Sequence, residues 1–277
     1  AERPNRRHPL VRAATATLLT VGAAGALLGG EALVTLTRDY LEKAPEPRPE
    51  GMFGPADGRP VRFAVLGDST AAGVGARTRE QAYPWLLADR LGHAGFRVEL
   101  RNYGVSGART ADVLATQVPT AVRDRPDLVL VAVGGNDVTH LTRLAKVRRD
   151  LRVAIARLRA TGATVVVTGV PDMRAHAFLE PLRSVAGWRG RTASEAIREV
   201  TTEEGVAFVP LRERTGHYFE TDPEGHFSSD MFHPGPGGYE RWADAIYPAL
   251  AQALAPAPRS APRPASSPSV SRSNTSG

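Results

Sequence analysis

The apolar positions between residues 61 and 254 fall into short runs rich in β-branched residues, separated by longer stretches with a helical period. The short runs fit buried parallel strands, because strands covered on both faces are apolar along most of their length. We expect strands at residues 61–66, 97–100, 128–133, 164–168 and 206–209.

The longer stretches predict helices around residues 83–93, 144–160, 192–204 and 238–254. Strands that alternate with helices are typical of strand-helix-strand units, which build a parallel sheet between two helical layers. The pattern therefore predicts an α/β fold, a three-layer α/β/α sandwich around a five-stranded parallel sheet. In such folds ligands bind at the carboxyl ends of the strands.

The first 36 residues have a different pattern. Residues 1–12 are basic, residues 13–30 carry no charge, and apolar character resumes after Glu31 as far as Leu36. This order is typical of an export signal or a membrane anchor, with cleavage left open; a helix of the main domain is the alternative reading. A basic flank before the apolar run favours export of the rest of the chain. We expect an extracytoplasmic protein that is membrane-anchored or secreted.

Proline and glycine mark the other boundaries. Residues 37–60 include a Pro/Gly-rich stretch from Ala44 to Pro60, which predicts a linker. Residues 255–277 are rich in proline and serine and have little to bury, so we expect a disordered tail. The predicted catalytic domain is therefore residues 61–254, and we expect it to be monomeric.

Charge and composition exclude several classes of function. The formal net charge is +6, but residues 1–12 hold four arginines against one glutamate, and residues 255–277 hold three arginines and no acid. The central part is therefore neutral and gives no reason to expect nucleic-acid binding. The chain has no cysteine, and its seven histidines form no H-E-x-x-H pair. We expect neither a metal nor another cofactor.

Ser69 is the first candidate for chemistry. It follows the first predicted strand in Gly67-Asp68-Ser69, at a strand-to-helix turn where backbone N–H groups could stabilise an oxyanion. Asp68 or Ser69 could equally be a helix cap, because both residue types are favoured there.

Two further loops supply candidate donors. Gly104 follows the second strand in Asn102-Tyr103-Gly104, where a missing Cβ would let the backbone N–H approach a ligand. Asn136 follows the third strand, and its amide could donate to an oxyanion. A plain turn and a helix cap are the respective alternatives.

Asp230 and His233 form the last candidate pair. A serine nucleophile needs an adjacent base that a third group orients, and these two residues supply both roles three positions apart. A lone loop histidine would more often be a solvated side chain. The combination with Ser69 favours a catalytic role.

These four segments together resemble the SGNH hydrolases, also called the GDSL esterase/lipase family, over residues 61 to about 254. The resemblance implies the flavodoxin-like fold of that family and the activity of a serine ester hydrolase. It implies that Ser69 is the nucleophile, that His233 is the base, and that Asp230 orients it. It also implies an oxyanion hole formed by the N–H groups of Ser69 and Gly104 and the side-chain amide of Asn136.

The substrate is left open by this resemblance. An esterase or lipase acting on small-molecule or lipid esters is the leading hypothesis; an acyltransferase or deacetylase on cell-envelope glycans and a non-catalytic surface binding module are the alternatives. Apolar residues in the 171–191 insertion and after Asn136 are candidate substrate contacts or core residues. These candidates are Val138, Leu141, Met173, Phe178 and Trp188.

Overall fold

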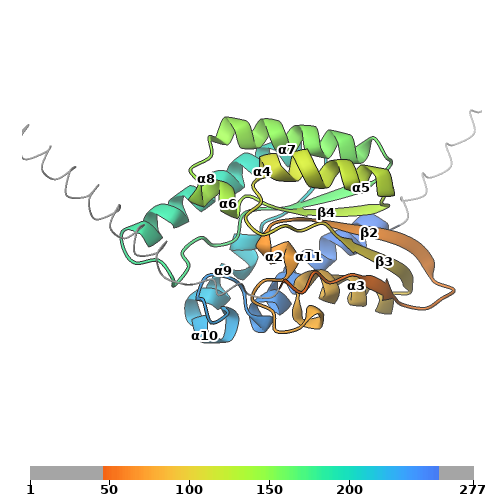
Figure 1. The fold of residues 1–277 in the computed structure, drawn as a ribbon, viewed down its shortest axis with the longest axis horizontal. Helices are drawn as coiled ribbons and strands as arrows, with labels where there is room; N and C mark the ends of the chain where they lie inside the picture. The colour runs from red at the N-terminus through yellow and green to blue at the C-terminus, as the bar shows by residue number, and fades with distance from the viewer. Residues whose placement is uncertain (1–45, 256–277) are drawn as a thin grey trace, which may run out of the picture.

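The computed structural model describes residues 46–255, which contain one mixed six-stranded sheet (Figure 1). The strands run in the order β1-β3-β2-β4-β5-β6 across the sheet, and β2 to β6 are parallel. These five are the five predicted strands. The bounds are β1 Gly51–Phe53, β2 Arg59–Gly67, β3 Phe96–Asn102, β4 Leu128–Ala132, β5 Thr164–Thr168 and β6 Ala207–Val209.

Helices cover both faces of the sheet, which confirms the three-layer prediction. In Figure 1, α5, α7 and α8 lie on one side of the sheet, and α3 and α11 lie on the other. The helical elements are α2 Ser69–Ala72, η1 Arg79–Gln81, α3 Tyr83–His93, α4 Thr110–Asp112, η2 Val113–Gln117, α5 Val118–Asp124, α6 Gly135–Thr139, α7 Leu144–Arg159, α8 Leu182–Glu203, α9 Leu211–Thr221, α10 Pro223–His226 and α11 Pro236–Leu254.

The apolar strands form because each of their faces is buried against a different helical layer. Phe63 and Val65 of β2 belong to the cluster formed with α3 and α11, whereas Ala64 and Leu66 belong to the cluster formed with α5, α7 and α8. Successive side chains of a strand point to opposite faces, so a strand with two covered faces needs apolar residues at every position.

The prediction of a linker is wrong from residue 46 onward, because this part of the chain belongs to the folded unit. Its strand β1 pairs antiparallel with β3 and forms one edge of the sheet. Phe53 is only 8% exposed, and its ring meets that of Trp85 edge-on at 4.7 Å. Burial of this ring is the physical reason that the folded unit begins well before residue 61.

The expected signal or anchor, residues 1–36, lies outside the described residues, as do residues 37–45 of the expected linker and residues 256–277 of the expected tail. Within residues 46–255, no helix has the length and apolar character needed to cross a membrane.

Candidate active site

The Gln117 side chain holds the turn that carries Ser69 in place. The Gln117 amide donates to Gly67 O at 2.8 Å and accepts from Gly67 N–H at 2.9 Å, so one side chain pairs both backbone groups at the end of β2. A Cβ at Gly67 would lie 2.3 Å from Ala132 O on β4. Glycine is therefore required at this close approach.

Asp68, rather than Ser69, caps α2. Its Oδ1 accepts hydrogen bonds from Thr70 N–H at 3.0 Å and from Thr70 Oγ at 2.9 Å. Burial raises the pKa of the Asp68 carboxyl, and the hydrogen bonds from Thr70 oppose that rise only in part. Because Asp68 takes the cap position, the Ser69 hydroxyl is free for another partner.

The loop that carries His233 is held by Asp230. Asp230 Oδ1 accepts hydrogen bonds from Ser228 Oγ at 2.7 Å and from the N–H groups of Phe232 and His233 at 2.9 Å each. His233 is buried, with 6% of its surface exposed. These contacts make the loop a rigid support for the imidazole.

Ser69, His233 and Asp230 form a hydrogen-bonded chain. His233 Nε2 lies 2.9 Å from Ser69 Oγ, and His233 Nδ1 lies 2.6 Å from Asp230 Oδ2. Burial would raise the pKa of Asp230, but the hydrogen bond and charge of His233, with Ser228 and Phe232, hold it at about 2. An ionised carboxylate only accepts, so Nδ1 carries the hydrogen and Nε2 can accept from the serine.

Asn136 lies at the start of α6 and reaches the loop after β3. Its Nδ2 donates one hydrogen to Ala108 O at 3.1 Å, which leaves the second amide hydrogen available. Gly134 caps the helix with a φ of 120°, so Asn136 is not the cap. The contact with Ala108 holds the amide in place between these two loops.

The structure does not give Gly104 the role of oxyanion donor that the resemblance implied. Its N–H donates to Asn102 Oδ1 at 2.9 Å, and the residue is buried where a Cβ would lie 2.6 Å from Ala72 N. The glycine at this position allows the loop to pack against α2. Because its hydrogen is already used, the structure does not support Gly104 as an oxyanion donor.

Gly107 has the properties that Gly104 lacks. It adopts a φ of 79°, and nothing lies within 4 Å of the position of a Cβ. No hydrogen bond within residues 46–255 uses its N–H, and it immediately precedes Ala108, the residue that accepts from Asn136. The sequence shows two glycines in this block and gives no sign of which N–H is free.

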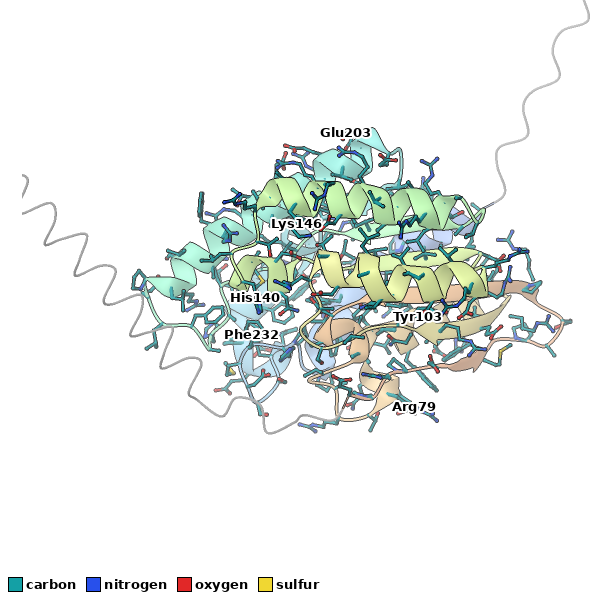
Figure 2. All side chains as sticks on the ribbon, turned by 45° about the horizontal axis from the view of Figure 1, so that its top comes forward. Arg79, Tyr103, His140, Lys146, Glu203 and Phe232 are labelled. Atoms are coloured by element: carbon teal, nitrogen blue, oxygen red, sulfur yellow. The ribbon has the colours of Figure 1, made fainter. Side chains whose placement is uncertain are left out.

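A cavity opens beside Ser69 and His233 at the carboxyl ends of β4 and β5. In Figure 2, Phe232 and His140, which follows α6, lie at this same end of the molecule. The lining is mostly apolar and includes Ser69, Asn136, Thr168, Met173, Phe219, Phe227, Phe232, His233 and Trp242. Several of these residues belong to α9, α11 and the loop before His233, none of which the sequence pattern linked to substrate.

Of the five predicted substrate contacts, only Met173 lines this cavity. Val138 is buried in the core between the sheet and α7, whereas Leu141 and Trp188 are 68% and 57% exposed. Phe178 packs against Phe232 with ring centroids 5.5 Å apart. The structure therefore places Phe178 behind the cavity wall and the other three away from the cavity.

The described residues hold no cluster of three or more histidine, aspartate and glutamate side chains that could bind a metal ion. They do hold a serine hydroxyl paired with an imidazole, an oriented carboxylate, and a free amide hydrogen on Asn136, which lines the same cavity. This set can activate a serine for attack on a carbonyl carbon and can stabilise the oxyanion that results.

Comparison with known proteins gives a consistent result. Residues 65–241 match the model of the GDSL-like Lipase/Acylhydrolase family. The chain is 32% identical over 267 residues to the GDSL-like esterase Rv1075c of Mycobacterium tuberculosis, covering 90% of this chain and 84% of that one. It is 28% identical over 189 residues to the esterase TesA of Pseudomonas aeruginosa, covering 67% of this chain and 86% of TesA.

Solved structures share the fold. A crystal structure of TesA superposes with a TM-score of 0.59 at 26% identity, covering 70% of this chain and 99% of that one. The acetyl xylan esterase AlAXEase superposes with a TM-score of 0.57 at 21% identity, covering 69% of this chain and 100% of that one. The second likeness concerns the fold alone.

Proposed function

The chain belongs to the GDSL-like lipase/acylhydrolase family and is a carboxylic-ester hydrolase, and we propose that it works through an acyl-enzyme formed on Ser69. The single observation that carries this proposal is the chain of hydrogen bonds from Ser69 Oγ through His233 to Asp230, at 2.9 and 2.6 Å.

In the acylation step, His233 Nε2 takes the hydroxyl proton while Ser69 Oγ attacks the ester carbonyl carbon. The C=O bond electrons move onto the carbonyl oxygen, and the tetrahedral intermediate then expels the alkoxy group, which takes the proton back from Nε2. Asp230 keeps the hydrogen on Nδ1 throughout. Water, deprotonated by the same nitrogen, then releases the acid and restores the serine.

We propose that three donors stabilise the oxyanion: the N–H groups of Ser69 and Gly107 and the free amide hydrogen of Asn136. The unused N–H of Gly107 and the contact of Asn136 with Ala108 support this set. Donors already fixed by the fold need not reorganise as charge develops, and each typically contributes about 2.7–4 kcal/mol.

Stopped-flow kinetics with a nitrophenyl ester test the acyl-enzyme. When deacylation is slower than acylation, nitrophenol should appear in a burst of about one equivalent per protein before the steady state. Adding hydroxylamine should then raise the steady-state rate by intercepting the acyl-enzyme. A covalent intermediate is ruled out if hydroxylamine changes neither the rate nor the products and the acid forms in step with nitrophenol from the first turnover.

We also propose that the chain is exported, and that residues 1–36 act as the signal or membrane anchor. The basic residues 1–12 followed by uncharged residues 13–30 support this. The test fuses alkaline phosphatase, which is active only outside the cytoplasm, after residue 60. We expect activity in intact cells that disappears when residues 1–36 are deleted; equal activity with and without them would contradict the proposal.

A further inference from the structure

The exposed apolar side chains of the described residues are concentrated beside the active site. Six large apolar side chains are exposed there, and four of them lie on α8, just before it, or just after α6. Single exposed apolar residues are ordinary, whereas a group of them in one place marks an interaction surface. The four residues, which we call the apolar face, are Leu141, Leu179, Val185 and Trp188.

Hydrogen bonds between α8 and the loop after α6 bring this face together. Arg189 donates to Val138 O at 3.1 Å and to Thr142 O at 2.7 Å, so this turn of α8 lies against the loop that carries Leu141. Trp188 directly precedes Arg189. The two most exposed side chains of the face, those of Leu141 and Trp188, therefore project from adjoining segments.

The apolar face also adjoins the cavity. A Cβ at Gly190 of α8 would lie 2.8 Å from Cγ of Met173, which lines the cavity. In Figure 1, the first turns of α8 project from the same end of the sheet at which α2 and α6 lie. The face is therefore part of the surface around the active site.

Basic side chains border the apolar face. Residues 139–143 and 179–191 contain four arginines and one acidic residue, Glu180. The ion pairs of this region involve other bases, such as Lys146 and Arg198, and within residues 46–255 none of the four arginines is paired with a carboxylate. The positive charge of the border is therefore not neutralised by the fold. The arginines are Arg143, Arg183, Arg189 and Arg191.

The chain enters the described fold at this same end of the sheet. Arg48 N–H donates to Ala72 O at 2.9 Å, so the first described residues lie beside the helix that carries Ser69. The nine residues 37–45 can span at most about 32 Å. With residues 1–36 in a bilayer, this end of the sheet is held near the lipid surface; this step rests on the anchor proposed above.

A second copy of the chain fits the apolar face poorly. A symmetric dimer brings the same patch of both subunits into contact, so arginines would face arginines, with only Glu180 of each copy to offset them. An anionic lipid surface fits better. Its phosphates attract arginines, and tryptophan and leucine side chains are favoured at the boundary between headgroups and acyl chains.

We propose that the apolar face docks on a membrane with anionic headgroups, so that the active site lies next to the bilayer. Leu141 and Trp188 enter the headgroup boundary, and the four arginines of the border lie near lipid phosphates. This role accounts for two side chains that are exposed and yet do not line the cavity.

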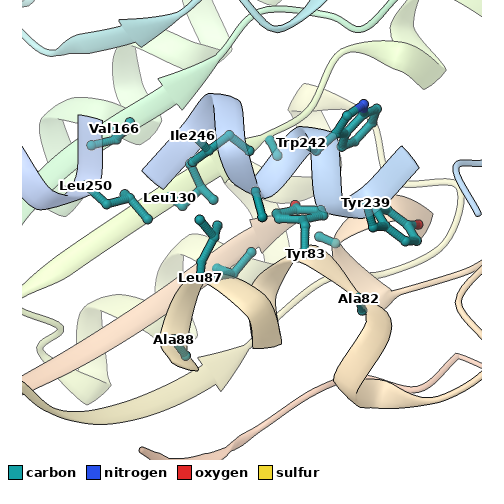
Figure 3. Close-up of a cluster of buried hydrophobic side chains, with 14 of the residues drawn as sticks. Ala82, Tyr83, Leu87, Ala88, Leu130, Val166, Tyr239, Trp242, Ile246 and Leu250 are labelled. Atoms are coloured by element: carbon teal, nitrogen blue, oxygen red, sulfur yellow. The ribbon is translucent and has the colours of Figure 1, made fainter. Parts of the chain in front are cut away.

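Quenching of Trp188 by brominated lipids tests the docking directly. The full chain is mixed with vesicles of brominated phosphatidylcholine, with or without brominated phosphatidylglycerol, and its emission is compared with that in unbrominated vesicles. The chain has three tryptophans. Trp242 is buried in the core with Tyr83 and Tyr239 (Figure 3), and Trp85 packs against a phenylalanine ring. Subtracting the emission of Trp188→Phe isolates that of Trp188.

We expect brominated anionic vesicles to quench most of the Trp188 emission, and zwitterionic vesicles to quench less. The ratio of quenched to unquenched Trp188 emission measures the docking equilibrium. Arg143→Gln/Arg191→Gln should lower this ratio by about fivefold for each arginine. The matched control, Arg123→Gln/Arg157→Gln, removes the same charge from exposed positions near the ends of α5 and α7 and should leave the ratio unchanged.

Trp188 emission that brominated anionic vesicles leave unchanged would overturn the inference, as would a ratio that Arg143→Gln/Arg191→Gln does not alter. A wild-type dimer in sedimentation without vesicles, dissociated by Trp188→Glu, would assign the face to a second copy and also overturn it. Flotation with zwitterionic vesicles tests the anchor separately. If the full chain does not float but Trp188 is quenched in anionic vesicles, the proposed anchor is wrong and the docking face is supported.

Discussion

Asp230 provides a sharp test of the mechanism, because an amide can replace its carboxylate without changing its shape. In Asp230→Asn, the remaining oxygen can still accept from Ser228, Phe232 and the His233 backbone, so the loop keeps its hydrogen bonds. The new NH₂ group faces His233 Nδ1, which must now accept. The ring hydrogen moves to Nε2, which can no longer accept the proton of Ser69.

The expected loss of kcat follows from this change in the tautomer of His233. A wrong histidine tautomer in a serine hydrolase lowers kcat by about 10⁴, or about 5.5 kcal/mol of transition-state stabilisation. We expect Asp230→Asn to lower kcat on nitrophenyl butyrate by this order at neutral pH. KM should change little, because the mutation leaves the cavity lining intact.

Asp222→Asn is the matched control. Asp222 also lies near a histidine, with its Oδ2 3.6 Å from His226 Nδ1, and its Oδ1 accepts from Gly225 N–H. We expect this variant to keep the kcat of the wild type. If Asp230→Asn kept more than about a tenth of the wild-type kcat while remaining folded, Asp230 would not set the tautomer of His233.

Three further predictions concern the oxyanion hole, the edge of the sheet and acid stability. Asn136→Ala should lower kcat by about 10²–10³ in steady-state kinetics, because one oxyanion donor is lost; a change in KM alone would contradict this role. Phe53→Ala should lower the free energy of unfolding in urea by about 3–5 kcal/mol, because the ring is buried against Trp85; a loss below about 1 kcal/mol would show that β1 is not part of the folded unit. Folding lowers the pKa of Asp230 from 3.8 to about 2, so the ionised carboxylate stabilises the native state above about pH 4. This contribution is of the order of 2 kcal/mol, and it is lost as the pH falls toward 2. The free energies of unfolding of the wild type and Asp230→Asn should therefore converge at low pH, and a gap that does not depend on pH would contradict the assignment.

The sequence was sufficient to predict those elements whose burial forces a clear pattern. The strands at 128–132 and 164–168 are covered on both faces, and their apolar runs show it directly. Strand β1 could not be predicted in this way, because it has three residues, only Phe53 is buried, and Gly51 and Gly54 lie on either side of the Met52-Phe53 pair.

The sequence also did not predict the first part of α8, which begins at Leu182 rather than near residue 192. Gly187 and Gly190 suggest a loop in the sequence, but a Cβ at these positions would lie 2.5 Å from Arg174 Cγ and 2.8 Å from Met173 Cγ. They are needed where the helix packs closely on the preceding segment. A sequence does not distinguish such a close approach from a turn.

In the candidate site, too, the sequence identified some residues and missed others. Ser69, Asp230 and His233 were identified because their residue types in this order point to one chemistry, and the structure brings them together. The cavity wall was not identified, because Phe219 and Trp242 are ordinary amphipathic-helix residues in the sequence. Their position beside Ser69 is set by the packing of α9 against α11, which residue patterns do not specify.

The identity of the nucleophile is tested most directly by a fluorophosphonate, which reacts with activated serines, followed by mass spectrometry of the labelled peptides. We expect one adduct per wild-type protein, located on Ser69, and the same adduct in Ser184→Ala, which removes an exposed serine on α8. Ser69→Ala should carry no adduct. An adduct on another residue of the wild type, or equal labelling of Ser69→Ala, would contradict the proposal that Ser69 is the nucleophile.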